Sequence, residues 1–425
     1  MNKELYQAYV NILREELIPA MGCTEPIAIA YAAAIARAAL GTLPERTEIC
    51  VSGNIIKNVK SVIVPHTGGL QGIQAAVAAG LVAGDERKEL EVLAEVTKEQ
   101  IEKMKEYLDS ADIQVSRAES DRVFEIEIRV FAGKHQTTVK IIDGHTNVVL
   151  VQRDQEVLYE NCAVSSDPEE AVHKTDHSLL TVEQIVAFAD EVEIDDIREV
   201  LDRQIAYNTA ISQEGLRGQY GAKIGKVLMS AYGDTVSNRA KAWAAAGSDA
   251  RMSGCELPVV INSGSGNQGM TVSLPIIVYG KELKVSDELL YRALVVGNLI
   301  AIHLKTGIGC LSAYCGATSA GCGAGAGIMY LYGGRNEEIA HTVVNALAIN
   351  SGMVCDGAKA SCAAKIASAV EAGLLGMEMC KRGCEFLGGD GIVTKGVEKT
   401  IANVGDLARE GMAQTDKEII QIMLR

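Results

Sequence analysis

Residues 310–327 read CLSAYCGATSAGCGAGAG, a run made mainly of glycine, alanine, serine and cysteine. Residues without bulky side chains let backbones approach one another closely. The whole chain has 42 glycines and only 4% aromatic residues, so we expect tightly packed helices rather than grooves lined with aromatic rings. From about residue 182 onward the pattern predicts a mostly helical region, interrupted by Gly-rich loops at 263–269, 307–327 and 351–357.

The composition is typical of a globular protein, with 48% apolar and 22% charged residues in 425. A formal net charge of −15 argues against nucleic acid and anionic membranes as partners. The first residues, MNKELYQAYVNILREEL, predict a charged amphipathic helix rather than a signal peptide. The nearest candidate for a membrane span, 27–40, is too short and contains Arg37. We therefore expect a cytoplasmic protein.

Ahead of the helical region the pattern changes. Residues 4–17 and 26–40 are predicted to be helices joined by a turn. Apolar and polar residues then alternate in several segments, which is typical of antiparallel strands. The predicted strands cover 47–54, 61–65, 123–131, 137–142 and 147–152, with helices at 71–82 and 98–108.

These elements indicate the α+β class, with a mostly helical C-terminal domain and a smaller mixed α/β domain that contains antiparallel strands. We predict N-terminal helices at 1–44 that pack on the helical domain, a mixed domain at 45–164 and the helical domain at 165–425. The small-residue helices also lead us to expect a homodimer.

The chain has eleven cysteines, and Cys315, Cys355 and Cys362 lie in Gly/Ala-rich sequence near the C-terminus. Thiolates gathered from separate segments suggest an iron–sulfur cluster or another thiophilic metal before they suggest disulfides. Their spacing matches neither the ferredoxin runs nor a zinc ribbon. The alternative is that they are buried cysteines acting as small apolar residues. Cys310 and Cys322 are further candidates for ligands.

Four segments carry a resemblance to a known family. They read ELIPAMGCTEP at 16–26, NSGSGNQG at 262–269, AYCGATSAGCGAGAG at 313–327 and MVCDGAKASCA at 353–363. Together they resemble the L-cysteine desulfidase family, which is related to the α-chain portion of bacterial iron–sulfur L-serine dehydratases. The resemblance covers essentially the whole chain.

The resemblance implies a 4Fe-4S enzyme that converts L-cysteine to pyruvate, ammonia and hydrogen sulfide. Cys315, Cys355 and Cys362 match the cluster-ligand cysteines of the family, and Cys23 matches the cysteine proposed as catalytic base. The helical domain would then be the catalytic one. Related sequences and L-serine dehydratases use a similar site, so L-serine is the alternative substrate.

Cys23 stands directly before a predicted helix, for which Thr24 is the expected N-cap. A thiolate there could remove the Cα proton of an amino acid, and a helix N-terminus lowers the pKa of a thiol. Glu25 opposes this lowering unless its carboxylate points away. Asp356 and Lys359, between two of the candidate ligands, could orient the cluster or substrate, or could be solvated.

Residues 264–269, GSGNQG, match the G-x-G-x-x-G dinucleotide pattern, but Pro275 follows too closely for the helix that this fingerprint must open. We favour a loop in which backbone N–H groups bind a substrate carboxylate together with three side chains, namely Ser263, Ser265 and Asn267. His66, in the PHTGG segment after a predicted strand, is a candidate for substrate binding or proton transfer.

Two other classes of function are alternatives. A pyridoxal-phosphate desulfhydrase would need a Schiff-base lysine, and Lys223, Lys226 and Lys305 come without a convincing phosphate cradle. A non-catalytic iron–sulfur or redox-sensing protein would not depend on Cys23 for its behaviour.

Overall fold

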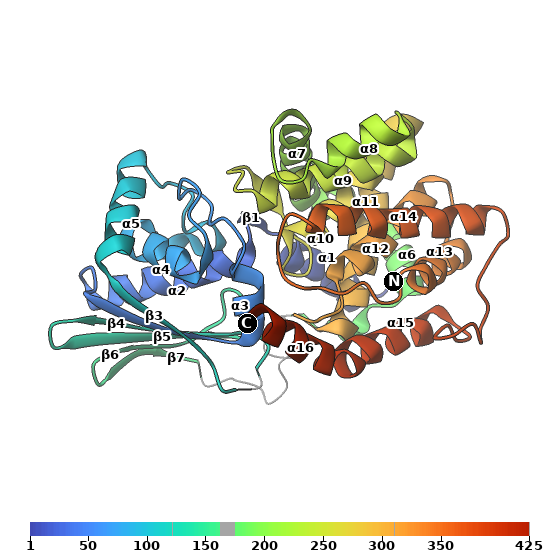
Figure 1. Cartoon of the computed structure of the whole chain (residues 1–425). Helices are drawn as coiled ribbons and strands as arrows, with labels where there is room; N and C mark the ends of the chain where they lie inside the picture. The colour runs from blue at the N-terminus through green and yellow to red at the C-terminus, as the bar shows by residue number, and fades with distance from the viewer. Residues whose placement is uncertain (121, 162–174, 310, 425) are drawn as a thin grey trace.

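The computed structural model describes residues 1–120, 122–161, 175–309 and 311–424. It contains a smaller region built on a sheet and a larger region built of helices, side by side (Figure 1). The predicted α+β class is confirmed. Most buried apolar side chains of both regions belong to one continuous core.

The larger sheet has six strands in the order β3-β2-β4-β5-β6-β7, in which β2 and β3 are parallel and every other neighbouring pair is antiparallel. Figure 1 shows helices α2, α4 and α5 over one face of this sheet. The strands are β2 Arg46–Val51, β3 Asp112–Arg117, β4 Glu125–Ala132, β5 His135–Ile142, β6 Val148–Arg153 and β7 Glu156–Glu160. The helices of this region are α2 Thr24–Leu40, α3 Gly53–Val59, α4 Gly72–Ala83, the 3-10 helix Glu86–Glu91 and α5 Lys98–Ser110.

The predicted strand at 61–65 is wrong. This segment contributes only an isolated bridge between Ile63 and Gln71. His66, Gly68 and Gly69 all have positive φ, so the backbone turns there instead of extending along a neighbouring strand. The end of the predicted strand at 47–54 belongs to α3, which follows β2 directly.

The N-terminal segment joins the two regions. It comprises α1 Lys3–Glu16, the short strand β1 Pro19–Met21 and then α2, and β1 pairs antiparallel with β8 Pro258–Val260 of the helical region. Helix α1 contacts α7 and α11 of the helical region, whereas α2, which was also expected to pack on that region, packs on α4 and on the sheet. The reason is that α2 is rich in buried alanines, which fit closely against α4. The domain limits at 44 and 164 stay a prediction.

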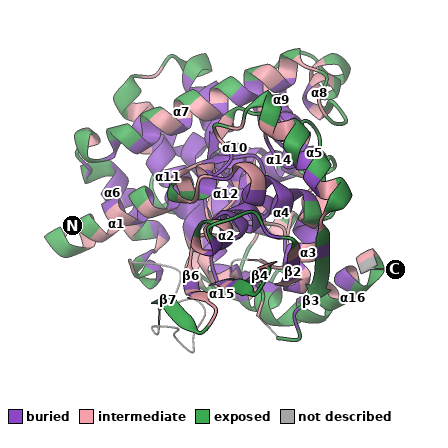
Figure 2. Ribbon diagram, turned by 90° about the vertical axis from the view of Figure 1, so that its left-hand side faces the viewer, coloured by how far each residue is buried: buried purple, intermediate pink, exposed green. Residues whose placement is uncertain are grey.

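The helical region surrounds α12, which Figure 2 shows among other buried helices. Its helical elements, in chain order, are η2 His177–Leu179, α6 Val182–Glu191, α7 Ile194–Arg217, α8 Ile224–Tyr232, α9 Val236–Met252, α10 Gly266–Leu283, α11 Asp287–Ile308, α12 Gly316–Leu331, α13 Asn336–Ile349, α14 Cys362–Lys381, α15 Val397–Asp406, η3 Leu407–Gly411 and α16 Ala413–Leu424.

The predicted Gly-rich loop at 307–327 is therefore mostly a helix. Glycine normally weakens a helix, yet those of α12 lie where neighbouring backbones touch it. A Cβ added at Gly321 would lie 2.2 Å from the carbonyl oxygen of Ala369 in α14, and one at Gly325 would lie 2.5 Å from that of Gly373. Close packing of α12 against α14 thus requires glycine and outweighs the local propensity.

Helix α11 is the one helix in the described ranges that is long and apolar enough to cross a membrane. Its apolar window is 72% buried within the protein, as in a helix of a protein core. Helix α16 runs back to the sheet region at the C-terminus (Figure 1), where Asp416 lies 2.5 Å from the buried Nζ of Lys57 in α3. This ion pair ties the last helix to the other region.

Candidate active site

A cavity of about 110 Å³ lies where the two regions meet. This is far below the 300–1,000 Å³ or so of pockets for drug-sized ligands, so it suits a small metabolite. The cavity is lined by the predicted site residues Cys23, Ser263, Ser265, Asn267, Cys315, Cys355 and Cys362.

Cys315 and Cys355 are brought together by two short extended segments. The Cys315 N–H donates to the Met353 carbonyl at 2.9 Å, and the Cys355 N–H donates to the Ala313 carbonyl at 2.6 Å. Cys315 then caps the N-terminus of α12 without a side-chain cap hydrogen bond. The two thiols form a hydrogen bond with each other.

The hydrogen bond between the thiols separates their acidities. It lowers the pKa of Cys355, which the positive charges of Lys57 and Lys365 lower further, against the effect of burial. The same hydrogen bond, together with burial, raises the pKa of Cys315 well above its usual value. The Cys355 sulfur is thus the one that most readily carries a negative charge.

Cys362 is the first residue of α14, and its Sγ donates to the Gly357 carbonyl at 3.6 Å. Asp356 accepts from both Lys359 and Lys365, and the hydrogen bonds from these lysines lower its pKa to about 2 despite burial. Lys365 also donates to the Val354 carbonyl at 2.7 Å. These contacts hold in place the loop that carries Cys355 and leads to Cys362.

Thiolates are the ligands of iron–sulfur clusters, so this set of side chains fits such a group in chemical type. No three His, Cys, Asp or Glu side chains in the described ranges are arranged to hold a single metal ion. Cluster ligands bind separate irons, so they do not need to meet at one point.

Cys23 occupies the N-cap position of α2, where Thr24 was expected, and makes no cap hydrogen bond. The Thr24 hydroxyl instead donates to the Gly264 carbonyl at 3.0 Å. Cys23 Sγ donates to Glu25 Oε2 at 3.1 Å, and Asn58 donates to the other carboxylate oxygen of Glu25 at 3.1 Å. Glu25 thus faces Cys23 from a buried position.

The expected lowering of the Cys23 pKa does not occur. Burial and the negative charge of Glu25 raise its pKa well above the usual value, and the charge of Arg251 offsets this only in part. A helix N-terminus cannot compensate for the loss of water around the thiolate. Cys23 is therefore a thiol in the free protein at neutral pH.

The segment 262–265 makes a tight turn before α10. Asn262 and Ser265 exchange two backbone hydrogen bonds of 3.1 Å, and the central residues Ser263 and Gly264 both have positive φ. Helix α10 begins at Gly266 and continues through Pro275. The prediction that Pro275 prevents a helix from opening here was therefore wrong. Among the residues that the structure describes, the preceding strand β8 pairs only with β1, antiparallel, and so it is not part of the parallel sheet that a dinucleotide-binding unit needs.

His66 does not line the cavity. Its Nδ1 lies 3.6 Å from Glu256 Oε1, and its part in substrate binding stays a prediction. Cys322 lies inside α12, away from the cavity, where burial raises its pKa to about 12, as for a small apolar core residue. Cys310 lies outside the described residues. Lys305 lines the cavity and donates to the Gly309 carbonyl.

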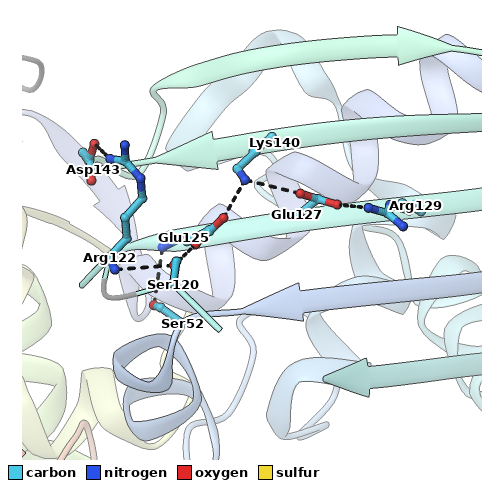
Figure 3. Close-up of polar contacts among 8 residues, drawn as sticks. All are labelled: Ser52, Ser120, Arg122, Glu125, Glu127, Arg129, Lys140 and Asp143. Atoms are coloured by element: carbon cyan, nitrogen blue, oxygen red, sulfur yellow. Dashed lines mark hydrogen bonds and ion pairs between the residues drawn. The ribbon is translucent and has the colours of Figure 1, made fainter. Parts of the chain in front are cut away.

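His145 is a cavity residue that the sequence reasoning missed. It follows Asp143, whose φ of 58° turns the chain and whose carboxylate lies 2.5 Å from Arg122 (Figure 3). The imidazole packs edge-on against Phe124, with ring centroids 4.9 Å apart, and burial lowers its pKa. A Cβ at Gly264 would lie 3.1 Å from this ring, which explains the glycine. In the sequence, the Asp-Gly-His segment at 143–145 between two predicted strands was the signal that could have indicated this turn.

Arg251, at the end of α9, was also missed. It is buried to 2% exposure and lines the same cavity. A lone arginine in an alanine-rich helix gives no periodic signal, and only the packing of α9 against α10 carries it to the cavity.

A family model described as serine dehydratase alpha chain matches residues 87–421. This chain belongs to the serine dehydratase alpha-chain family. Among curated relatives, a UPF0597 protein of Desulfitobacterium hafniense is 58% identical over 99% of this chain and 97% of its own length. UPF0597 proteins of Lachnoclostridium phytofermentans and Treponema denticola are 51% and 46% identical, each over at least 99% of both chains.

Membership of the serine dehydratase alpha-chain family supports a lyase-type function for the chain. The names of the UPF0597 relatives state no activity or cofactor. The substrate and the cofactor are therefore inferred from the residues that line the cavity.

Proposed function

We propose that this protein is an iron–sulfur lyase that eliminates sulfide from L-cysteine to give pyruvate, ammonia and hydrogen sulfide. The observation that carries the proposal is that Cys23, Cys315, Cys355 and Cys362 border one small buried cavity. Three of these cysteines come from the helical region, and the fourth comes from the start of α2. Family membership supports a lyase and leaves the substrate to be inferred.

Cys315, Cys355 and Cys362 would hold a 4Fe-4S cluster, and the lowered pKa of Cys355 favours the thiolate that such binding needs. When bound, a cluster with three protein ligands supplies an open iron that acts as a Lewis acid toward the leaving group. Sulfur is a soft ligand that iron binds well, which favours L-cysteine over L-serine as substrate.

Cys23 and Glu25 would move the proton. The Cys23 thiol already donates to the Glu25 carboxylate, so transfer along this 3.1 Å hydrogen bond creates the thiolate without changing the net charge of the pair. A thiolate whose pKa is raised by burial is the stronger base toward the Cα proton. Asn58 holds the other oxygen of Glu25 in place.

The elimination then balances. The Cα–H bond breaks as Cys23 takes the proton, and the electron pair forms the Cα=Cβ bond. The Cβ–S bond breaks with its electron pair on sulfur, which takes up the proton that Glu25 received from Cys23 and leaves as hydrogen sulfide. The 2-aminoacrylate released tautomerises and reacts with water to give pyruvate and ammonia.

L-serine dehydration is the second candidate function, because the matching family model carries that enzyme's name. The same residues would remove the Cα proton, and water would leave in place of hydrogen sulfide.

The test is to reconstitute the protein with iron and sulfide without oxygen, desalt it, and measure pyruvate and sulfide released from L-cysteine and pyruvate from L-serine. We expect equal amounts of pyruvate and sulfide from L-cysteine, at a higher kcat/KM than for L-serine. Pyruvate from L-serine alone would replace the desulfidase with a dehydratase. Turnover that persists in the protein before reconstitution, with its iron removed by a chelator, would contradict the cluster.

A further inference from the structure

We propose that Arg251 is the carboxylate-binding residue of the cavity and sets its specificity for α-amino acids, an inference that rests on the proposed function. Its guanidinium is enclosed by protein, and its Nε and Nη2 atoms have no hydrogen-bond partner among the described residues. Unsatisfied buried donors on a permanent charge are costly, so they indicate a missing anionic partner.

The surroundings of Arg251 point to where that partner lies. A Cβ added at Gly266 would lie 2.5 Å from Nε and 2.9 Å from Cζ of Arg251. Gly266 is the first residue of α10, an 18-residue helix whose N-cap residue, Ser265, makes no side-chain cap hydrogen bond. The guanidinium therefore lies beside the start of α10 in the wall of the cavity, and a positive charge and a helix N-terminus both favour a negative charge there.

The same corner also offers acceptors. Asn267 Oδ1 and Gln268 Oε1 line the cavity, are buried and have no hydrogen-bond partner in the described part of the chain. A simple inorganic anion would leave these oxygens unused, whereas the ammonium group of an amino acid can donate to them. A Cβ at Gly316 would lie 2.6 Å from the Gln268 amide, so this end of the pocket adjoins Cys315.

The arrangement assigns an orientation to the substrate. The carboxylate lies at Arg251 and the start of α10, and the charge of Arg251 already acts on Cys23 by lowering its pKa. The Cα proton would then lie on the Cys23 side and the β-substituent toward Cys315. Arg251 is thus a substrate-binding residue that positions the reacting atoms.

The experiment uses two probes that cannot undergo elimination, L-alanine and L-alaninamide. Both carry the ammonium group, and only L-alanine carries a carboxylate. Their dissociation constants are measured by calorimetry with the reconstituted protein for wild type, Arg251→Gln and Arg251→Lys. Arg217→Gln, which removes an exposed arginine paired with Glu214 on α7, is the matched control.

For wild type and Arg217→Gln we expect L-alanine to bind about 10- to 100-fold more tightly than L-alaninamide, as for a charge-assisted hydrogen-bonded pair. Arg251→Gln should abolish this difference by weakening L-alanine alone, and Arg251→Lys should retain part of it. If Arg251→Gln does not fold, as judged by circular dichroism, the wild-type comparison and Arg251→Lys decide.

Equal binding of the two probes to wild type, or an unchanged preference in Arg251→Gln, would overturn the assignment. An equal loss of affinity for both probes would also overturn it, since that indicates a structural role. Turnover of L-cysteine by the same wild-type preparation tells whether the proposed function survives such a failure.

Discussion

At the scale of single residues, burial rather than position on a helix governs the acid–base state of the site. Cys23 stands at a helix N-terminus, yet enclosure and Glu25 raise its pKa well above the usual value. The proposed base, Cys23, therefore depends on Glu25, which the sequence analysis treated only as opposing a lower Cys23 pKa. Glu25 becomes the acceptor of the Cys23 proton.

Replacing Glu25 with Gln separates these two effects of the carboxylate. Its negative charge raises the Cys23 pKa, so Glu25→Gln should shift the rise in thiolate absorbance to lower pH. The Cys23 thiol would lose its proton acceptor, and turnover of L-cysteine should fall about 10²- to 10⁴-fold. The absorbance at 240 nm is read as the difference between Glu25→Gln and the double variant with Cys23→Ala. An unchanged titration, as expected for the exposed Glu4→Gln, would contradict the pairing.

Asp249 gives a prediction about stability and pH. It is buried in α9, and burial raises its pKa to about 6 from 3.8, although N–H groups at the start of α8 oppose the rise. Between these values the folded state holds the proton more tightly than the unfolded state, so stability falls as pH rises from about 4 to 6. At about 1.4 kcal/mol per pKa unit, Asp249→Asn should raise the free energy of unfolding at pH 7.5 by about 1–3 kcal/mol.

Chemical denaturation at pH 4.5 and 7.5 measures this effect. The gain from Asp249→Asn should be present at pH 7.5 and smaller at pH 4.5. Asp195→Asn, at a carboxylate with 91% of its side chain exposed, should change stability little at either pH. Destabilisation by Asp249→Asn at pH 7.5 would mean that the ionised carboxylate stabilises α8.

At the scale of elements, the glycines of α12 allow close packing of the two helices that carry two of the proposed cluster ligands. Gly321 lies so close to Ala369 that an added Cβ would meet its carbonyl oxygen at 2.2 Å. Helices α12 and α14 carry Cys315 and Cys362 at their N-termini, so their spacing also sets the distance between the two thiols.

Gly321→Ala should therefore destabilise the protein by about 1–3 kcal/mol through overpacking, although alanine favours a helix more than glycine does. Gly352→Ala is the control, since a Cβ there would have nothing within 4 Å and its φ is not positive. We expect this control to lie within about 0.5 kcal/mol of wild type in thermal or chemical denaturation. Equal stability of the two variants would show that the helices can move apart at no cost.

At the scale of the whole molecule, the sequence indicated much of the architecture and part of the site. The alternating runs at β4, β5 and β6 and the apolar helices follow from local periodicity, so they could be predicted. The glycines of α12 were mistaken for a loop, because their purpose is contact with α14 and contacts between distant segments leave no local pattern.

The cavity residues likewise fall into those that the sequence indicated and those that it did not. Motif-bearing residues such as Cys23, Cys315 and Ser263 line it as a group. His145 and Arg251 come from a strand connection and a helix end in different regions, and only the folded chain brings them together. A polar residue without a neighbouring motif cannot be recognised as part of a site from sequence alone.

The central claim is that three cysteines hold a cluster while the fourth acts on the substrate. The most direct measurement is iron per chain together with pyruvate formation from L-cysteine, for oxygen-free reconstituted wild type and single Cys→Ala variants at 23, 315, 322, 355 and 362. We predict that the variants at 315, 355 and 362 lose iron and turnover. Cys23→Ala should keep its iron and lose turnover, and Cys322→Ala should keep both. Full iron content in the three ligand variants, or wild-type turnover by Cys23→Ala, would contradict the account.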